Sequence, residues 1–228
     1  MVRGRGYDFP MPSVVPAPFL FRFALPVHRV ADLPRDSAPW LKLPESCRLV
    51  NAGALGEEPQ IADLRAAWNA DGLAISVKVG GKKFPPFCDP GDVERSDGLR
   101  LWFDMRDTKS LHHATRFCQH FILLPAGGGK NGLEPIAKPL PVARAREEAP
   151  RVDEDDVLVW SNVGKTGYEL EAWFPASVLN GFDPASQPKL GFFYQVHDSE
   201  LGDQSFSVTS SFPVASDPSL WGTLLLEK

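Results

Sequence analysis

The sequence predicts an all-β fold, an antiparallel β-sandwich formed by a single domain. Three observations lead to this prediction. Apolar and polar residues alternate in several short segments, most clearly over Leu73–Val79, and a period of two residues is typical of strands. The 228 residues include 22 prolines and 19 glycines, which separate these segments. No helical pattern reaches three turns, so many short strands joined by turns are expected.

The expected strands follow one another along the whole chain. The first spans residues 19–25 and is closed by Pro26, and two weaker candidates span 48–51 and 61–68, the second of which could also be a short helix. Residues 126–141 are expected to be a loop, and the charged residues 144–156 a solvated strand face or hairpin rim. The clearer strands are residues 73–79, 99–103, 117–124, 157–161, 168–174, 190–198, 205–211 and 220–226, with a short helical turn near 176–180.

Composition narrows the class of protein. Residues 1–16 are expected to form a proline-rich arm and residues 17–228 a single β-sandwich domain. The net charge of −5 argues against a nucleic-acid-binding surface, which usually carries a basic stripe. Three cysteines without metal-type spacing predict reduced, buried thiols. The sequence shows no signal peptide and no membrane span, so a cytoplasmic location is the default expectation.

Five motifs, in order along the chain, resemble those of family 9 carbohydrate-binding modules and their DOMON-like relatives. They are a tryptophan-turn-strand opening at 67–73, an aspartate-bounded strand at 96–104, a strand leading to a proline at 167–175, a strand ending in His-Asp at 190–198 and a closing turn at 217–222. The resemblance covers roughly residues 60–228. It implies a β-sandwich fold and a non-catalytic domain that binds carbohydrate.

The sugar-binding residues of that family are not preserved. In well-studied members two tryptophans sandwich the sugar, and a glutamate and an arginine bind it by hydrogen bonds. The resemblance places the tryptophans near Glu94 and Ala215 and the glutamate at Arg100, and no residue between His120 and Ile122 matches the arginine. The scaffold therefore resembles the family, while its usual sugar clamp is replaced.

The predicted ligand-binding residues are Arg100, Trp102, His120, Gln195 and His197. Arg100 and Trp102 lie two residues apart on one strand and therefore share a face. A guanidinium can bind sugar hydroxyls and an indole can stack on a pyranose. Alternatively, Trp102 covers a hydrophobic patch with Arg100 stacked over it. Gln195 and His197 share a face of another strand, where they either extend this polar surface or form a hydrogen-bonded layer under loops.

Zinc and calcium are the two metals for which the sequence offers candidate ligands. His112, His113, Cys118 and His120 contain the right atoms for zinc, but their spacing matches no standard site. The resemblance also implies structural calcium, for which oxygen ligands are available at Asp89, Asp92, Asp97, Asp104 and Asp198. Asp97 and Asp104 could equally hold turns through their side chains.

No complete catalytic motif is present. Glu169 and Glu171 are neighbours on one strand and do not face each other across a cleft, which predicts a solvated or salt-bridged face. The sequence therefore favours a binding domain with a saccharide as its ligand and no membrane or nucleic-acid partner. The alternatives are a haem or redox domain, for which Met105 is the only methionine in the strand region, and a structural or protein-interaction domain. Oligomeric state is left open.

Overall fold

The computed structural model describes residues 22–52, 60–207 and 212–227, which form eleven strands and three single-turn 3-10 helices. The predicted arm at residues 1–16 lies outside the described residues. The short helices are η1 (Glu45–Cys47), η3 (Glu154–Asp156) and η4 (Pro218–Leu220). The strands are β1 (Ala24–Arg29), β2 (Ala62–Asn69), β3 (Gly72–Gly80), β4 (Gly98–Asp104), β5 (Cys118–Gly128), β6 (Glu134–Leu140), β7 (Leu158–Val163), β8 (Gly167–Pro175), β9 (Lys189–Asp198), β10 (Gly202–Ser205) and β11 (Gly222–Leu226).

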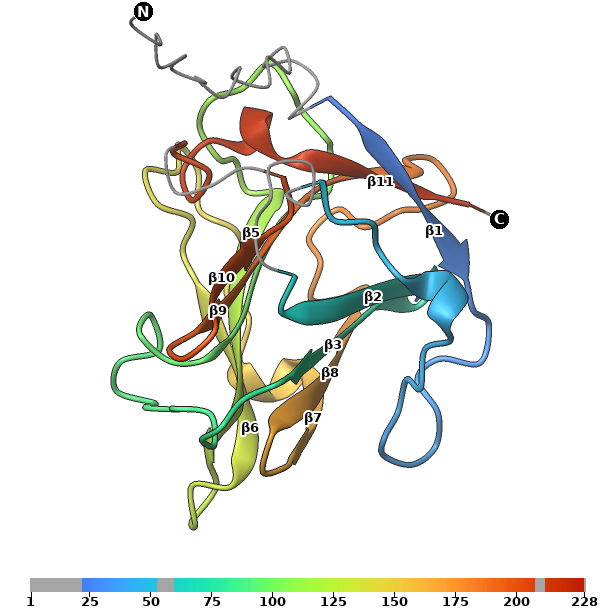
Figure 1. Cartoon of the computed structure of the whole chain (residues 1–228). Coiled ribbons are helices and arrows are strands. Elements are labelled where there is room, and N and C mark those ends of the chain that lie inside the picture. Colours follow the sequence, from blue (N-terminus) through green and yellow to red (C-terminus); the bar gives the residue numbers. More distant parts are fainter. Residues whose placement is uncertain (1–21, 53–59, 208–211, 228) are drawn as a thin grey trace, which may run out of the picture.

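The strands form two packed layers that are joined along one side by β1 (Figure 1). One layer has the order β6-β5-β4-β9-β11 and the other the order β2-β3-β8-β7, with β10 paired to β9. β1 runs parallel to β11 and to β2, and all other pairs are antiparallel. The two layers also approach each other on the side opposite β1. There the Ser161 hydroxyl of β7 donates a hydrogen bond to the Pro125 carbonyl of β5 at 2.6 Å. The β-sandwich prediction is confirmed, with the sheet closing nearly into a barrel.

The core lies between the two layers, where the alternating apolar residues meet. Leu99, Leu101 and Phe103 of β4 point inward and are fully buried. Phe174 of the opposite layer contacts Phe103 and Phe121, with ring centroids 5.3 Å and 4.9 Å apart. Burial of such aromatic side chains is the main favourable contribution to a sandwich of this kind. The space between the layers is thereby filled by side chains.

The first strand differs from the prediction. It spans Ala24–Arg29, and Pro26 lies inside it instead of closing it. Within β1, β11 pairs with residues 24–27 and β2 with His28 and Arg29, so Pro26 has a strand partner on one side only. Proline is tolerated at such edge positions because no donor is needed on the open side. The candidate strand at 48–51 is reduced to a single bridge between Arg48 and Arg65, whereas 61–68 is strand β2 and not a helix.

The predicted loop at 126–141 is wrong, since residues 134–140 form β6. The prolines of this segment argued against a strand. β6 is the last strand of the sheet and has one open edge, where proline is tolerated because no N–H donor is needed there. β5 also continues past Pro125 to Gly128, with a bulge after Leu124. The charged segment 144–156 forms no strand and contains η3. Near 176–180 the chain makes hydrogen-bonded turns, one of them from Val178 N to Pro175 O.

Near the end of the chain, the strand expected at 205–211 is only partly seen. β10 spans Gly202–Ser205, and residues 208–211 lie outside the described part of the chain. The remaining expected strands agree with β3, β4, β5, β7, β8, β9 and β11 to within a few residues. Where alternation was clear in the sequence, the strand assignment was therefore correct.

Candidate ligand-binding site

The structure brings the five predicted ligand-binding residues onto one face of three adjacent strands. β4, which carries Arg100 and Trp102, lies between β5 and β9. Trp102 is directly opposite His120 of β5, and Arg100 is directly opposite Gln195 of β9. Opposed residues of an antiparallel pair share a face, and so do residues two apart on a strand, which adds His197. This face points away from the core between the layers.

Trp102 is buried on this outer face, with 4% of its surface exposed. Its ring stacks on the His120 imidazole, with centroids 4.4 Å apart and planes only 5° from parallel. Phe193 meets it edge-on at 5.7 Å. The indole Nε1 has no hydrogen-bond partner among the described residues. Among the described residues, Trp102 makes no cation–π contact with Arg100, so the expected stacking of these two side chains is not seen.

Arg100 is a buried cation with few partners. Its side chain donates through Nη2 to the Glu94 carbonyl. Nη1 is buried and has no hydrogen-bond partner among the described residues. Arg100 forms no ion pair with any of those residues either. Burial lowers the pKa of this guanidinium, and the more distant charges of Asp203 and Glu94 oppose that shift. A buried guanidinium with unused donors is costly. It is suited to bind an oxygen-rich group.

Gln195 and His197 are both held by Asp203 of β10. Gln195 Nε2 donates to Asp203 Oδ2 at 3.1 Å, and His197 Nδ1 lies 2.6 Å from Asp203 Oδ1. Asp203 pairs directly with His197 in the β9–β10 hairpin. Asp203 is not among the predicted site residues, because the strand expected in this region begins only at residue 205, whereas β10 spans Gly202–Ser205. The periodicity of β9 places Gln195 and His197, but their partner depends on the hairpin register.

A pocket of about 400 Å³ opens on this face beside Trp102. We call it the Trp102 pocket. Its floor is formed by Trp102, Phe193, Gln195 and Ser205, and its sides by residues 143–144 and 212–216. Ala215, where the resemblance places a sugar-stacking tryptophan, is one of these lining residues. Glu94, the other such position, binds Arg100 on the neighbouring part of the face.

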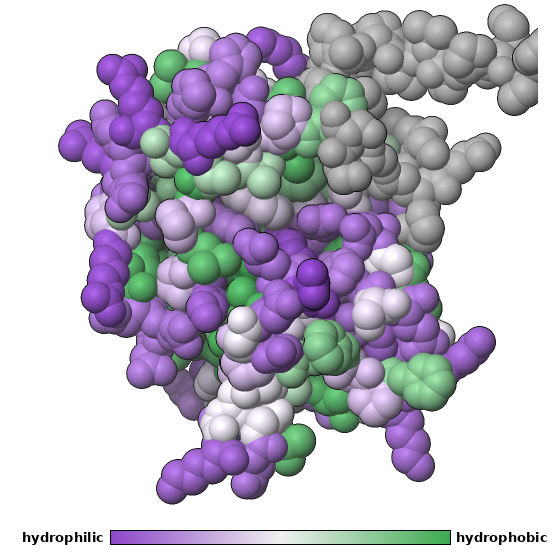
Figure 2. All heavy atoms as spheres, turned by 90° about the vertical axis from the view of Figure 1, so that its left-hand side faces the viewer, coloured by the Kyte–Doolittle hydropathy of each residue, from purple (hydrophilic) through white to green (hydrophobic). Residues whose placement is uncertain are grey.

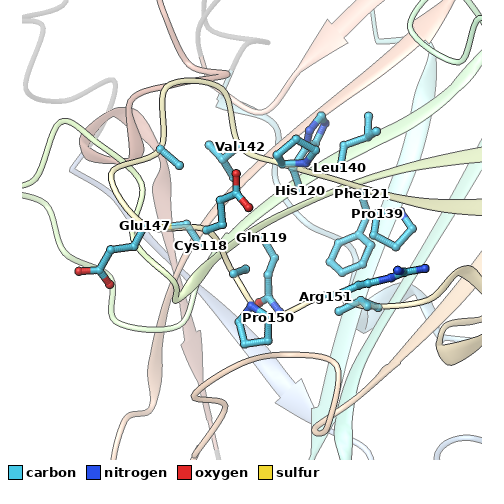
Figure 3. Close-up of a pocket in the computed structure, with 15 residues that line it drawn as sticks. Cys118, Gln119, His120, Phe121, Pro139, Leu140, Val142, Glu147, Pro150 and Arg151 are labelled. Atoms are coloured by element: carbon cyan, nitrogen blue, oxygen red, sulfur yellow. The ribbon is translucent and has the colours of Figure 1, made fainter.

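A second pocket, of about 450 Å³, lies beside His120 (Figure 3). We call it the His120 pocket. It is lined by residues 118–121 of β5, by residues 139–140 of β6, and by residues 141–142, 145 and 147–152 of the segment that follows β6. The two pockets adjoin at the stacked ring pair, since Trp102 lines one and His120 the other.

Two of the proposed calcium ligands converge, but on a lysine. Lys82 Nζ lies 3.0 Å from Asp97 Oδ2 and 2.5 Å from Asp198 Oδ2, and all three side chains are almost completely buried. Burial alone would lower the pKa of Lys82, but its hydrogen bonds to the two carboxylates raise it above the usual value. The ammonium thus supplies the positive charge between these two carboxylates.

The other candidate metal ligands are dispersed over the structure. Asp104 accepts hydrogen bonds from the backbone N–H groups of Arg106 and Thr108, as expected of a turn-holding aspartate. Asp89 binds the Gly91 N–H, and Asp92 lies near Arg95. Within the described ranges no three His, Cys, Asp or Glu side chains are grouped as a metal site would require.

One exposed contact among the described residues resembles a Ser-His-Asp triad but lacks its geometry. The Ser219 hydroxyl lies 3.1 Å from His112 Nδ1, and Asp217 Oδ2 lies 3.0 Å from the same nitrogen. The hydroxyl donates to Asp217. A catalytic histidine must bind the serine and the aspartate through different ring nitrogens. This cluster therefore cannot pass a proton in the manner of a triad.

The paired glutamates do not form an acid–base pair. Glu169 forms an ion pair with Lys78 on the exposed side of the sheet, as predicted for a salt-bridged face. Glu171 is buried instead and accepts hydrogen bonds from the backbone N–H groups of Leu41 and Lys42, at 2.9 Å and 2.8 Å. Glu171 thus fixes the loop that follows β1.

The thiols are poor nucleophiles. Burial raises the pKa of Cys47, and it raises that of Cys88 to about 11 and that of Cys118 to about 12. Only the thiolate is strongly nucleophilic. The prediction of reduced thiols agrees with three free cysteines, two of them buried and Cys88 partly buried.

The outer surface of the molecule is mixed in character. Figure 2 shows the side that carries the β9–β10 hairpin and the loop before β4, where apolar atoms occur in small groups among hydrophilic ones. Small apolar groups of this kind are ordinary on a protein surface. None of the described helices is long and apolar enough to cross a bilayer.

Comparison with known proteins bears on the fold. No family model matches the sequence, and no curated protein matches it significantly. Two solved structures of a Caldicellulosiruptor kristjanssonii family 9 carbohydrate-binding module, one with cellotriose and one with glucose, match with TM-scores of 0.60 and 14% identity. The alignments cover 90% of this chain and 93% and 95% of those chains. The chain shares the fold of family 9 carbohydrate-binding modules.

A third structure supports the same conclusion. A proposed carbohydrate-binding protein from Bacteroides uniformis ATCC 8492 matches with a TM-score of 0.55 and 16% identity, over 90% of this chain and 99% of that one. At these identities the likeness establishes architecture only. The resemblance to family 9 modules seen in the sequence is confirmed at the level of the fold, and the DOMON-like relationship stays a prediction.

Proposed function

We propose that this domain binds a carbohydrate, without catalysis, in the Trp102 pocket. The observation that carries the proposal is the gathering of Arg100, Trp102 and Gln195 on one outer face, beside a pocket lined by Trp102 and Gln195. The fold, shared with modules solved in complex with cellotriose and glucose, supports it. Binding pockets for small polar ligands typically combine aromatic walls with a few well-placed polar groups.

The residues of the pocket suit the two kinds of surface that a sugar presents. Trp102, Phe193 and Phe212 provide apolar walls for the C–H face of a pyranose. Gln195 and Arg144 provide polar groups for its hydroxyls. Arg100 lies directly opposite Gln195 on the next strand, and its Nη1 donor has no hydrogen-bond partner among the described residues. A buried unused donor is stabilised most by a ligand oxygen.

The structures that share this fold are carbohydrate-binding modules and a proposed carbohydrate-binding protein, which supports a binding role over an enzymatic one. Nothing in the described part of the structure favours the haem alternative. Met105 is fully buried in the core and lines none of the pockets described above. A structural domain without a small ligand is the outcome that the following experiment would reveal.

The test is calorimetric titration of the full chain with glucose, glucuronate and cellotriose. Gln195→Leu removes the amide while keeping the size of the side chain, and we expect it to weaken saccharide binding at least tenfold, which is about 1.4 kcal/mol. The control is Gln187→Leu, because Gln187 lines neither pocket and hydrogen-bonds only to nearby backbone. Absence of binding to the wild-type protein at millimolar saccharide would refute the proposal.

A further inference from the structure

A loop covers only part of the outer face of the layer formed by β2, β3, β8 and β7 (Figure 1). Residues 30–47, which follow β1, pack on this face through a buried cluster that consists of Leu33, Leu41, Leu43, Cys47, Ala67, Ala74 and Trp173. Two neighbouring rows of outward-facing residues lie beyond this cluster. They are Arg65, Ser76, Glu171 and Trp160 in one row and Asp63, Lys78, Glu169 and Asn162 in the other.

A pocket of about 350 Å³ lies where the loop meets these rows. We call it the Trp160 pocket. Its floor is formed by residues of β2, β3 and β8, and its walls by Trp160 of β7 and by residues 39 and 42–43 of the loop. The strand register places Trp160 outward, since it pairs with Glu171 and its neighbour Val159 packs against the core. The volume falls within the range of about 300–1,000 Å³ that is typical of small-ligand sites.

Hydrogen bonds from two strands hold the loop wall of this pocket in place. Arg65 of β2 donates through Nη1 to the Leu43 carbonyl at 2.8 Å. Glu171 of β8 accepts hydrogen bonds from the backbone N–H groups of Leu41 and Lys42. The wall is therefore fixed before a ligand arrives, which reduces the entropic cost of binding.

The charged side chains of the Trp160 pocket balance one another. Among the described residues, the acidic ones that line it are Asp63, Glu169 and Glu171, and the basic ones are Lys42, Arg65 and Lys78. Asp63 accepts two hydrogen bonds from Arg65, at 3.2 Å and 2.9 Å, which lower the pKa of Asp63 and raise that of Arg65. Arg48 beside Asp63 and Glu45 near Arg65 add one charge of each sign. These residues carry no excess of either charge, which favours a neutral ligand over an ionic one.

The pocket combines an aromatic wall with fixed polar groups. Trp160 is half-buried, so part of its side chain is open to a ligand. Glu169, which is paired with Lys78, and Ser76 of the central strand β3 offer oxygen atoms to hydroxyl groups. Lys42 is exposed and offers ammonium donors. An indole suits the C–H face of a pyranose, and ionised donors and acceptors form strong hydrogen bonds to its hydroxyls.

We propose that the Trp160 pocket is a second binding site, for a neutral saccharide, and that one domain thereby binds two glycan segments. The proposal rests on the proposed function only for the class of ligand, because the two pockets are lined by different residues. The Trp102 pocket lies on the outer face of the layer that contains β4 and β9, and the Trp160 pocket on the outer face of the other layer. The two sites therefore open on different faces, and binding of two segments of one polymer would raise the overall affinity through avidity.

Calorimetric titration of the full chain with cellotriose tests the proposal through the number of sites. We expect two equivalents of cellotriose per wild-type chain and one per Trp160→Ala chain, because loss of the indole should weaken the second site at least tenfold. Leu158→Ala is the matched control, since Leu158 lies two residues away on the same face of β7 and outside the Trp160 pocket. It should leave two equivalents. The tenfold loss expected for Gln195→Leu then applies to one of the two.

A milder variant keeps the test decisive if Trp160→Ala does not fold. Glu169→Gln keeps the size of the side chain and breaks only an exposed ion pair, which contributes little to stability. An amide is a weaker acceptor than a carboxylate, so we expect at least a threefold loss of affinity at this site.

The variants of the two pockets separate the two proposals. If the wild-type chain binds one equivalent that only Gln195→Leu weakens, the second site is wrong and the proposed function stands. If it binds one equivalent that only Trp160→Ala weakens, the Trp102 pocket is not the site and the Trp160 pocket is. Two equivalents with unchanged affinity in both Trp160→Ala and Glu169→Gln would refute the second site. Absence of cellotriose binding to the wild-type chain at millimolar concentration would refute both proposals.

Discussion

At the scale of single residues, His120 links the chemistry of the site to the stability of the domain. Its ring stacks on Trp102, and its folded pKa of about 4 lies below the usual 6.5 because of burial first and Arg100 second. The folded protein therefore binds a proton at this position less readily than the unfolded chain. Stability falls as the pH drops from about 6.5 towards 4, since protons then favour the unfolded state.

This dependence predicts the behaviour of His120→Phe. Each unit of pKa difference corresponds to about 1.4 kcal/mol, so His120 should account for roughly 3 kcal/mol of the stability lost between pH 6.5 and 4. The variant, which cannot be protonated there, should lose correspondingly less. Urea unfolding of both proteins at half-unit steps of pH measures the difference. Parallel profiles over this range would show that His120 takes up its proton equally in both states.

At the scale of elements, Lys82 joins segments that are far apart in sequence. Its ammonium binds Asp97, just before β4, and Asp198, at the end of β9. Each carboxylate also fixes backbone, Asp97 through the N–H groups of Phe87 and Ser199 and Asp198 through those at positions 200 and 201. One buried ammonium therefore anchors the loop after β3 and the β9–β10 turn, which border the ligand-binding face.

Removal of this charge predicts a large loss of stability. Lys82→Met keeps much of the apolar stem but leaves two buried carboxylates without their cation, and we expect a cost of about 3–5 kcal/mol. Lys83→Met is the matched control, because the Lys83 side chain is exposed and it should change stability by less than about 0.5 kcal/mol. Chemical denaturation of the three proteins compares them. Equal midpoints for Lys82→Met and wild type would show that the ion pairs contribute little.

The sequence predicted elements well where side chains alternate and poorly where backbone context decides. In β4 the alternation of Leu99, Leu101 and Phe103 with other residues predicts both the strand and its inward face. Arg100 and Trp102 were therefore correctly placed together on the opposite face. β6 was missed because Pro135 and Pro139 oppose a strand unless it has an open edge. The contacts of Asp203 with Gln195 and His197 could not be predicted, because they depend on the register of the β9–β10 hairpin. Those of Lys82 with Asp97 and Asp198 depend on how the loop after β3 folds back.

At the scale of the whole molecule, the two layers share one core. The Val27 side chain of β1 belongs to the same buried cluster as Phe103 of one layer and Phe174 of the other. The Trp68 indole N–H of β2 also binds the carbonyls of Val27 and Glu227, at 3.0 Å and 3.1 Å. Neither layer can therefore expose its inner face without disrupting the other, which is the condition for cooperative unfolding.

We accordingly expect a single unfolding transition. Tryptophan fluorescence and far-ultraviolet circular dichroism should give the same denaturant midpoint, because both layers lose structure together. Val27→Ala should lower that common midpoint, at a cost of about 1–3 kcal/mol, without separating the two signals. Two resolved transitions in the wild-type chain would mean that the layers unfold independently.

Because Cys47 and Cys118 are buried and Cys88 is partly buried, the rate at which each thiol is labelled reports local opening of the structure around it. With pKa values raised to about 11 for Cys88 and about 12 for Cys118, almost no thiolate exists in the folded chain near neutral pH. Alkylating reagents and mild oxidants should therefore react with these thiols mainly after local opening has exposed them. Cys88 is only partly buried, in the loop before β4, whereas Cys118 is fully buried beside the His120 pocket. The order in which the thiols are labelled thus reports which part of the barrel opens first.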